Sequence, residues 1–380
     1  MIDDLEELVT CESFSSDLAA VARSAKVVAA MGARHLGATP ETIVVDGVTH
    51  LRWSFGTPRV LLLGHHDTVW PIGTLVTHPW SLIDGVARGP GVFDMKAGLV
   101  QTFHALAGLG SLDGISVLVT GDEEVGSTTS RALIEECARG LSAAFVLEGS
   151  ADGGALKTAR KGTSDYTVTV YGKAAHAGLE PWNGANAGIE LAHQILTIAG
   201  MAAMADSADL VDASGTISAT GTTGTAGTAG TTVTPTVLAG GTTLNTVPAL
   251  ARVGVDVRVP TLAAQSRVDL LMRALSPQVE GTRLEVTGGP NRPPMEASRS
   301  AELFGLAQAL AAGLGVGPLL QASVGGASDG NFTAGMGVPT LDGLGAVGGG
   351  AHADHEHVVV AEMPRRAALL RALVAAFLSS

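Results

Sequence analysis

Apolar residues in the first third of the chain follow two alternating patterns. Helical spacing recurs in three segments, at residues 17–36, 95–109 and 127–139. Short runs of mostly apolar residues lie among them, at residues 59–64, 115–120 and 143–148. Such runs are typical of strands buried in a parallel sheet, and residues 41–55 predict a hairpin that turns at Asp46-Gly47. The alternation predicts an α/β fold with right-handed crossovers.

The pattern changes near residue 164. Residues 165–171 alternate between polar and apolar side chains, as in an antiparallel strand with one solvated face. Further elements are expected in the order helix 184–200, strands 234–240, 244–247 and 251–258, helix 261–275 and strand 283–287. This order predicts a smaller α+β block inserted into the α/β domain. After Pro290 the helix and strand patterns resume, and they end in a helix over about residues 362–378.

We therefore expect two domains, which agrees with a length of 380 residues. The larger domain would comprise residues 1–162 and 291–380, and the inserted domain residues 163–290. Residues 214–232 consist mostly of Gly, Thr and Ala and carry no charge. They hold too little apolar surface to offset the entropy of ordering, so we expect a flexible loop.

Charge and composition narrow the class of protein. The formal net charge is −13, from 23 Lys and Arg against 36 Asp and Glu, which argues against a nucleic-acid-binding body. We find no run near the ~18 apolar residues of a spanning helix, and the acidic start does not resemble a signal peptide. A cytoplasmic protein with no membrane or nucleic-acid partner is expected. Cys11 and Cys137 are too few for a disulfide framework.

Polar residues follow three of the predicted parallel strands, where ligands bind in open α/β sheets. His65 and Asp67 follow the first strand, Glu123 and Glu124 the second, and Glu148 the third. Asp94 lies in a glycine-rich turn that opens the helix at 95–109. Each motif alone has a plain alternative: a polar loop, a helix N-cap or a solvated acidic turn. Their convergence at one edge of the sheet favours a metal site with a carboxylate base.

A histidine-rich tract at residues 348–357 adds further candidate ligands. A solvated loop is the alternative interpretation. Two histidines and three carboxylates, without cysteine, suit Zn²⁺. With one carboxylate bridging, such a set would fill two adjacent metal positions and leave room for a water.

In combination these motifs resemble those of the di-zinc metallopeptidase family 20, which includes bacterial glutamate carboxypeptidase, acetylornithine deacetylase, succinyl-diaminopimelate desuccinylase and aminoacylase. The resemblance spans about residues 57–365 and rests on the stretches GHHDTV, GPGVFDMKAG, GDEEVGS, GKAAHAG, GGASDG and GAHADHEHV. It implies a zinc-peptidase-like mixed sheet flanked by helices. It also implies a ferredoxin-like lid domain through which two chains form a homodimer.

The resemblance implies a role for each candidate metal ligand. His65 and Glu148 would bind one zinc ion, Glu124 and His352 the other, and Asp94 would bridge the two. A cis peptide bond after Asp94 is also implied. Co²⁺ or Mn²⁺ could substitute for the two Zn²⁺ ions of each subunit.

The remaining assignments concern catalysis and substrate. By the same resemblance, Asp67 would orient the zinc-binding histidine beside it and Glu123 would be the general base. His176 would reach the active site of the partner subunit. Asn245 and Arg258 would contact the carboxylate end of the substrate.

The expected activity is amide hydrolysis that releases a C-terminal amino acid, glutamate first, from peptidyl or N-acyl conjugates. Glu rather than Asp at 148 favours this branch over the aminopeptidases. An N-acyl-amino-acid deacylase, such as acetylornithine deacetylase or aminoacylase, is the near alternative. Glu123 disfavours a non-catalytic metal-binding relative. A dinucleotide-binding protein is disfavoured because no G-x-G-x-x-G follows an early strand. His355 and His357 stand where the family usually has Lys and Tyr, so His355 competes with His352 as the late ligand.

Overall fold

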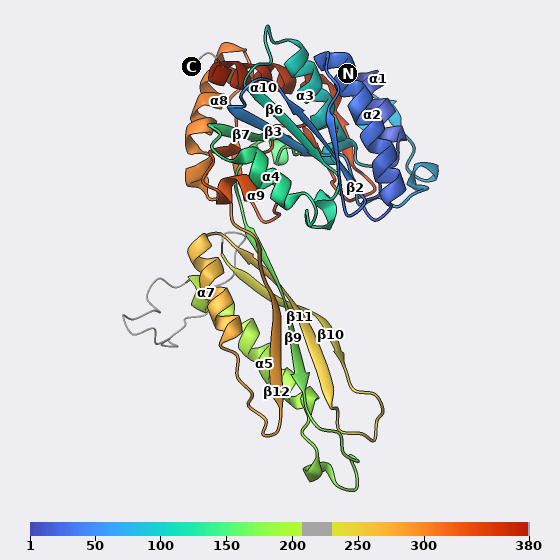
Figure 1. Ribbon diagram of the computed structural model, residues 1–380, viewed down its shortest axis with the longest axis vertical. Helices are drawn as coiled ribbons and strands as arrows, with labels where there is room; N and C mark the ends of the chain where they lie inside the picture. The colour runs from blue at the N-terminus through green and yellow to red at the C-terminus, as the bar shows by residue number, and fades with distance from the viewer. Residues whose placement is uncertain (207–229, 379–380) are drawn as a thin grey trace. The chain divides into compact units, whose positions relative to one another are not determined.

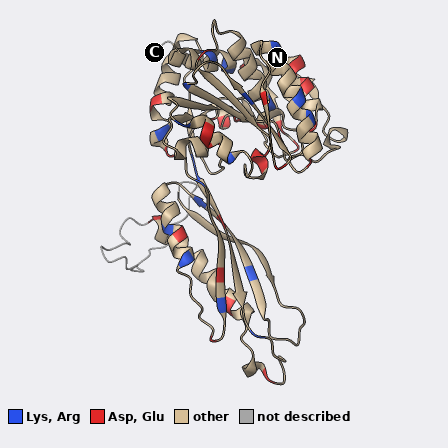
Figure 2. Cartoon of the chain, in the orientation of Figure 1, with Lys and Arg blue, Asp and Glu red and all other residues tan. Residues whose placement is uncertain are grey.

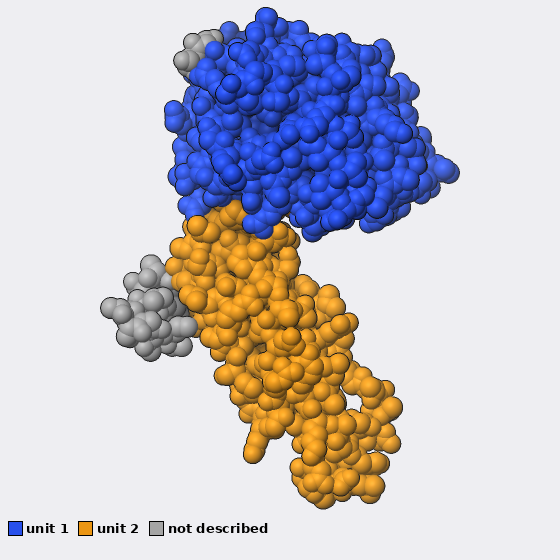
Figure 3. Space-filling view, viewed as in Figure 1, with its two compact units in different colours: residues 1–160, 295–324, 328–380 blue, residues 161–294, 325–327 orange. Residues whose placement is uncertain are grey.

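The computed structural model describes residues 1–206 and 230–378 (Figure 1). The chain forms two compact units, which Figure 3 shows in different colours. Unit 1 comprises residues 1–160, 295–324 and 328–380, and unit 2 comprises residues 161–294 and 325–327.

Unit 1 is a mixed α/β structure around one central sheet. Its helices are α1 (Ile2–Thr10), α2 (Leu18–Leu36), α3 (Ala97–Ala107), α4 (Arg131–Ala138), α8 (Ala301–Gly313), α9 (Gly330–Gly335) and α10 (Met363–Leu378). The strands of the central sheet are β1 (Glu41–Val45), β2 (Val48–Ser54), β3 (Val60–His65), β6 (Ile115–Thr120), β7 (Ala143–Val146) and β14 (Thr340–Leu341). The smaller sheets contain β4 (Ser81–Ile83), β5 (Val86–Arg88), β8 (Leu156–Arg160), β13 (Gln321–Val324), β15 (Gly348–Gly349) and β16 (His357–Val359).

The central sheet has the strand order β1-β2-β6-β3-β7-β14. Strands β6, β3, β7 and β14 run parallel to one another. β1 and β2 form an antiparallel hairpin at the edge, and β2 pairs with β6 in the antiparallel direction. Asp46 and Gly47 turn this hairpin with φ of 48° and 86°, as the predicted Asp-Gly turn requires. The predicted α/β architecture is therefore confirmed.

Both faces of the central sheet are covered by helices, which explains the continuous apolar runs. In β3, Val60 and Leu62 are buried in the cluster that contains residues of α1, α2, α3, α8 and α10. Leu61 and Leu63 are buried in the other cluster, with residues of α4 and α9. Figure 2 shows the parallel strands β3, β6 and β7 without charged residues. A strand with two buried faces shows no polar alternation.

Unit 2 has the β-α-β-β-α-β order of a ferredoxin-like domain. Its elements are β9 (Gly162–Tyr171), α5 (Ala187–Ala199) with the short α6 (Met201–Asp206), β10 (Thr232–Gly240), β11 (Leu250–Val259), α7 (Leu262–Arg273) and β12 (Arg283–Arg292). The strands form an antiparallel sheet in the order β10-β11-β9-β12. Alternate side chains of β9 and β11 are buried, in agreement with the predicted period of two.

The prediction of a strand at 244–247 is wrong. Within this segment Thr246 makes only an isolated bridge, with His176. Leu244 is fully exposed and only Val247 is buried, so the segment lacks the alternating buried face of a strand, and the following Pro248 cannot donate a backbone hydrogen bond. The predicted loop at 214–232 lies outside the described residues up to residue 229. Its last residue, Thr232, begins β10.

The segment Ala187–Asp206, which spans α5 and α6, meets the length and hydropathy requirements of a membrane-crossing helix. No segment of this kind was expected from the sequence. Core helices of soluble proteins meet the same length and hydropathy requirements, and one side of this segment is buried in the core of unit 2. The buried side consists of Ala187, Leu191, Ile198, Met201 and Ala205.

Candidate metal centre

The predicted polar residues gather at one edge of the central sheet. His65 is the last residue of β3, Glu123 and Glu124 begin three residues after β6 ends, and Glu148 follows β7 by two residues. Because β6, β3 and β7 are parallel neighbours, their carboxyl ends lie at the same edge. Asp94 arrives from the turn that precedes α3, and its peptide bond to Met95 is cis, as the resemblance implied.

Asp94 directs its two carboxylate oxygens toward different histidines. Its Oδ1 lies 3.3 Å from His65 Nε2, and its Oδ2 lies 3.3 Å from His352 Nε2. Ligand atoms of one tetrahedral zinc ion, with bonds of about 2.0–2.2 Å, stand about 3.3 Å apart. The spacing therefore fits two metal positions that share Asp94.

Two further carboxylates complete the two halves of the site. Glu148 Oε1 lies 3.6 Å from His65 Nε2, and Glu124 Oε2 lies 3.1 Å from His352 Nε2. The structure thus gathers all five of the predicted metal ligands. His352 adopts a left-handed backbone conformation with φ of 62°. His355, the competing candidate, is exposed, and its backbone carbonyl accepts a hydrogen bond from Arg88.

Two buried ligand atoms without hydrogen-bond partners give a second reason to expect a dinuclear metal centre. His65 Nε2 and Glu124 Oε1 are buried, and neither has a hydrogen-bond partner among the described residues. Buried polar atoms are rarely left in this state. A bound cation would satisfy both atoms, and imidazole and carboxylate are ligands that Zn²⁺ accepts.

Opposite charges within the site shift its pKa values. Hydrogen bonds to Asp94 and Glu124 raise the pKa of His352 to about 10. Burial raises the pKa of Glu124 to about 7, against the opposing effect of His352. Burial alone would lower the pKa of His65, but the neighbouring carboxylates of Asp67, Asp94 and Glu148 hold it well above its ordinary value. These carboxylates together create a site that attracts positive charge.

Asp67 connects the end of β3 with the turn that follows β6, a contact that the sequence did not predict. Its backbone carbonyl lies 3.0 Å from His65 Nδ1, whereas its carboxylate Oδ1 lies 3.4 Å from the same atom. The carboxylate instead accepts hydrogen bonds from the backbone amides of Glu123 and Glu124, each at 3.2 Å. Ser15 Oγ donates a third, at 2.7 Å. Asp67 therefore positions the Glu123-Glu124 turn as well as the imidazole.

Glu123 is buried beside the half of the site that contains His65 and Glu148. One of its carboxylate oxygens lies within 4.8 Å of ligand atoms of both His65 and Glu148. This position suits a base that takes a proton from a water between the metal positions and the substrate.

Arg160 is a buried residue of the site that the sequence analysis missed. Its guanidinium binds both carboxylate oxygens of Asp342, with Nε–Oδ2 of 2.6 Å and Nη2–Oδ1 of 3.2 Å. Its Nη2 also lies 3.5 Å from Glu148 Oε2, so the other oxygen of Glu148 faces His65. Arginine residues at strand ends are common, and nothing in the sequence marks this one.

Glu356 is a second missed residue, and it is almost fully buried. It accepts backbone hydrogen bonds from Gly91, Phe93 and Asp94 at 2.9–3.0 Å, and one from Trp70 Nε1 at 2.8 Å. The carboxylate therefore supports the turn that carries Asp94. The available signal in the sequence was the period of two in the segment that leads into β16, which puts Glu356, one residue before the strand, on the same side as the buried Val358.

The remaining predicted residues lie in unit 2. The backbone amide of Ala177 donates to the carbonyl of Asn245 at 2.9 Å, so the segments that carry His176 and Asn245 are adjacent. Arg258 lies near the other end of β11, eight residues from Leu250, which is about 27 Å of strand. Its guanidinium binds Asp256, with an Nη2–Oδ2 distance of 2.7 Å.

Comparisons with known proteins identify the family and the fold. The sequence matches the model of Peptidase family M20/M25/M40 over residues 61–376. Carboxypeptidase G2 from Pseudomonas sp. (strain RS-16) is 28% identical over 389 residues, which cover 96% of this chain and 86% of that protein.

Solved structures share the fold at low sequence identity. The M20 family metallo-carboxypeptidase Sso-CP2 from Sulfolobus solfataricus has a TM-score of 0.73 at 16% identity, and the match covers 99% of this chain and 98% of that one. The YXEP protein of Bacillus subtilis, described as a dinuclear metal binding peptidase from the M20 family, has a TM-score of 0.61 at 14% identity. That match covers 100% of this chain and 97% of the other.

Proposed function

This chain belongs to peptidase family M20/M25/M40, and from that premise we propose that it is a zinc carboxypeptidase. It would hydrolyse the amide bond that joins a C-terminal amino acid, glutamate first, to a peptidyl or N-acyl group. Members of the family are metallo-hydrolases, so the proposal adds the metal and the substrate.

One observation carries the proposal: the two oxygens of Asp94 each lie 3.3 Å from a different histidine. A shared carboxylate between two nitrogen ligands is the arrangement that a pair of metal ions needs. The outer ligands Glu124 and Glu148 are both carboxylates and no cysteine takes part, which supports Zn²⁺ with Co²⁺ or Mn²⁺ as substitutes.

The chemistry divides between the ions and the side chains. When bound, metal ions of this kind lower the pKa of a coordinated water from 15.7 to about 7 and polarise a carbonyl group. Glu123 would accept the proton of the attacking water and return it to the leaving nitrogen. His176 would donate a hydrogen bond from Nε2 to the carbonyl oxygen as negative charge develops there.

Recognition of the product end would rest on Arg258. A guanidinium binds a free carboxylate with two parallel hydrogen bonds. The chain as a whole carries −13, so an anionic substrate needs such a local cation. The carboxypeptidase relative supports this choice of substrate end.

A panel of N-acyl-amino acids and dipeptides tests the proposal. The zinc-loaded protein would be assayed for free amino acid, with each substrate paired with its C-terminal amide. We expect release from acidic C-termini, loss with the amides, and no release by Asp94→Asn. Selection by the acyl group with indifference to the amino acid would indicate an N-acyl-amino-acid deacylase instead. No release from any member would refute the proposal.

We further propose that two chains pair through unit 2. On α5, Ile189 and Leu196 are 54% and 74% exposed, and on the edge strand β10, Val237 and Leu238 are 64% and 61% exposed. Large apolar side chains on a helix and an adjacent sheet edge favour a protein partner. Sedimentation of the wild type and of Leu196→Glu tests this pairing: we expect a dimer for the first and a monomer for the second.

A further inference from the structure

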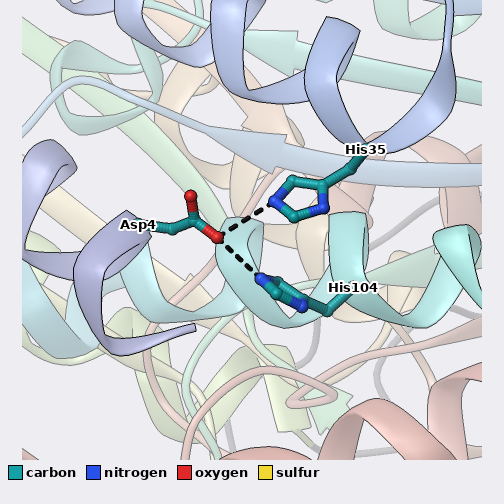
Figure 4. Close-up of side chains that lie close together, drawn as sticks. All are labelled: Asp4, His35 and His104. Carbon is teal, nitrogen blue, oxygen red and sulfur yellow. Dashed lines mark hydrogen bonds and ion pairs between the residues drawn. The ribbon is translucent and has the colours of Figure 1, made fainter.

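Three side chains from three helices meet in unit 1, outside the centre described above (Figure 4). Asp4 belongs to α1, His35 to the last turn of α2, and His104 to the last turn of α3. Asp4 Oδ2 lies 3.0 Å from His35 Nε2 and 2.7 Å from His104 Nε2. The two imidazole rings lie 4.2 Å apart at an angle of 47°, and both turn a nitrogen toward the same oxygen.

We propose that Asp4, His35 and His104 form an auxiliary site for one divalent transition-metal ion. The three ligand atoms all lie within 4.8 Å of one another. Two imidazoles and one carboxylate suit Zn²⁺, Co²⁺, Ni²⁺ or Cu²⁺, whereas Ca²⁺ and Mg²⁺ require oxygen ligands. Water would complete the coordination shell.

The present distances are those of hydrogen bonds, and a modest movement converts them into a metal site. Ligand atoms on a tetrahedral ion stand about 3.3 Å apart, so each imidazole would move about 0.3–0.6 Å from Asp4 and lose its Nε2 proton. The side chains of Asp4, His35 and His104 are 15%, 20% and 26% exposed. They therefore have room to rotate, and an ion can reach them from solvent.

The groups around Asp4 orient its carboxylate, and two of them are themselves cations: Arg34 and the Met1 ammonium, whose nitrogen lies 3.8 Å from Oδ2. Arg34 Nη2 lies 3.0 Å from the other oxygen of Asp4, Oδ1, and 2.6 Å from Glu7 Oε2. Partners of this kind fix the orientation of metal ligands. His35 and His104 both lie at the carboxyl ends of their helices, where the negative end of the helix dipole stabilises positive charge.

This site is distinct from the dinuclear centre. Asp94 precedes α3, whereas His104 lies seven residues beyond Ala97, about 10 Å along that helix. An ion here would tie the nine-residue α1 to α2 and α3. Because it would bind only when the three helices are packed, it would stabilise the folded state by mass action.

Zinc titration of tag-free protein tests the proposal. Protein already loaded with two zinc ions would be dialysed against increasing Zn²⁺, and bound metal would be counted. We expect a third equivalent in the wild type. Loss of an outer partner of a metal ligand costs about 10–100-fold in affinity, so His35→Gln and His104→Gln should weaken the third equivalent at least that much. Both variants should retain the first two ions and the hydrolytic activity.

His78→Gln is the matched control. His78 Nε2 lies 3.3 Å from Asp354 Oδ1, and among the described residues no third ligand joins this pair. We expect this variant to bind the third ion as the wild type does. Amide hydrogen exchange supplies a second readout, because the third ion should slow exchange in α1 only where both histidines are present.

Two results would overturn the proposal. Binding that stops at two equivalents would mean that Asp4, His35 and His104 form a hydrogen-bonded cluster only. A third equivalent that survives in both histidine variants would place the ion elsewhere. If a histidine variant also loses the first two ions, the same titration is repeated with Asp4→Asn, which keeps the shape of the side chain. Loss of the third equivalent in this variant supports the proposal, and its survival places the ion elsewhere.

Discussion

Glu356 Oε1 accepts a hydrogen bond from the backbone amide of Asp94 at 3.0 Å, although the two residues are 262 positions apart. Glu356 stands four residues after His352. The tract that supplies one of the two histidines facing Asp94 therefore also holds the Asp94 turn in place. Burial raises the pKa of Glu356, against four hydrogen bonds that favour the charged form.

Glu356→Gln should lower metal affinity although Glu356 is not itself a predicted metal ligand. Each oxygen of Glu356 accepts two hydrogen bonds, so an amide nitrogen in one position would face two donors. Buried donors without partners cost about 1–3 kcal/mol each. We expect a lower free energy of unfolding in urea and weaker binding of both ions, measured by competition with a chelator. Trp70→Phe, which removes one donor outside the turn, should retain both ions.

The alternation of helices and strands was predictable because it depends on local patterns. The run at 60–63 predicts a strand covered on both faces, and the structure has helices on both faces. The strand at 244–247 was wrong because four residues of mixed polarity reveal nothing about whether a core lies beneath them. The extended span of β12, which continues to Arg292, was also missed, since Gly288, Gly289 and Pro290 are typical of turns.

The site residues also separate into those that local sequence patterns predict and those that depend on contacts between distant parts of the chain. His65, Glu124 and Glu148 were predictable because each follows a strand and the carboxyl ends of parallel strands meet. Arg160 and Glu356 were missed because their importance depends on contacts with residues far away in sequence. The choice between His352 and His355 needed the turn geometry, which determines which imidazole faces Asp94. The catalytic and substrate roles stay predictions, as do the domain boundaries.

Two metal ions per chain are expected, because Asp94 can serve both halves of the site. Removal of metal with a chelator should abolish hydrolysis, and two equivalents of Zn²⁺ should restore it, with bound metal counted by elemental analysis. Asp94→Asn should lose both ions, whereas Glu148→Gln should mainly lose the ion on the His65 side. Full activity with one ion per chain would contradict the prediction. The count should be made in His104→Gln, so that the auxiliary site does not contribute.

Glu123→Gln and Glu124→Gln should have opposite effects on metal and turnover. Glu124 Oε2 lies 3.1 Å from His352 Nε2, so loss of its charge should release the ion on that side. Glu123→Gln should keep both ions and lower kcat by about 10²–10⁴-fold, the usual contribution of a general base. Metal analysis beside single-turnover kinetics separates the two effects. Loss of metal in Glu123→Gln would mean that Glu123 is itself a ligand.

Arg258→Ala should impair substrates with a free C-terminal carboxylate more than their amides. A charge-assisted hydrogen bond is worth about 1.5–3 kcal/mol, which corresponds to roughly 10–150-fold in kcat/KM. Asp256→Asn is the informative partner, because Asp256 binds Arg258 in this structure. If Arg258 binds substrate, Asp256→Asn should leave KM unchanged or lower it. Equal losses in both variants, on acids and amides alike, would mean that the pair only stabilises β11.

His176 combines an exposed ring with a defined hydrogen-bonding state. Its Nδ1 accepts hydrogen bonds from the backbone amides of Gly178 and Leu179, each at 3.1 Å. In the neutral ring the proton therefore resides on Nε2, which is available as a donor. If His176 serves the neighbouring subunit, each active site takes Glu123 from one chain and His176 from the other.

Mixed dimers of His176→Ala and Glu123→Gln chains test this arrangement. Each mutant homodimer should be nearly inactive, because every site lacks one of the two groups. In the mixed dimer one site would lack both groups, and the other would combine an intact Glu123 with an intact His176. Activity should therefore reappear at about half the level of the wild type per dimer, measured on dimers purified with two different affinity tags. A mixed dimer as inactive as its parents would mean that His176 acts within its own chain or takes no part.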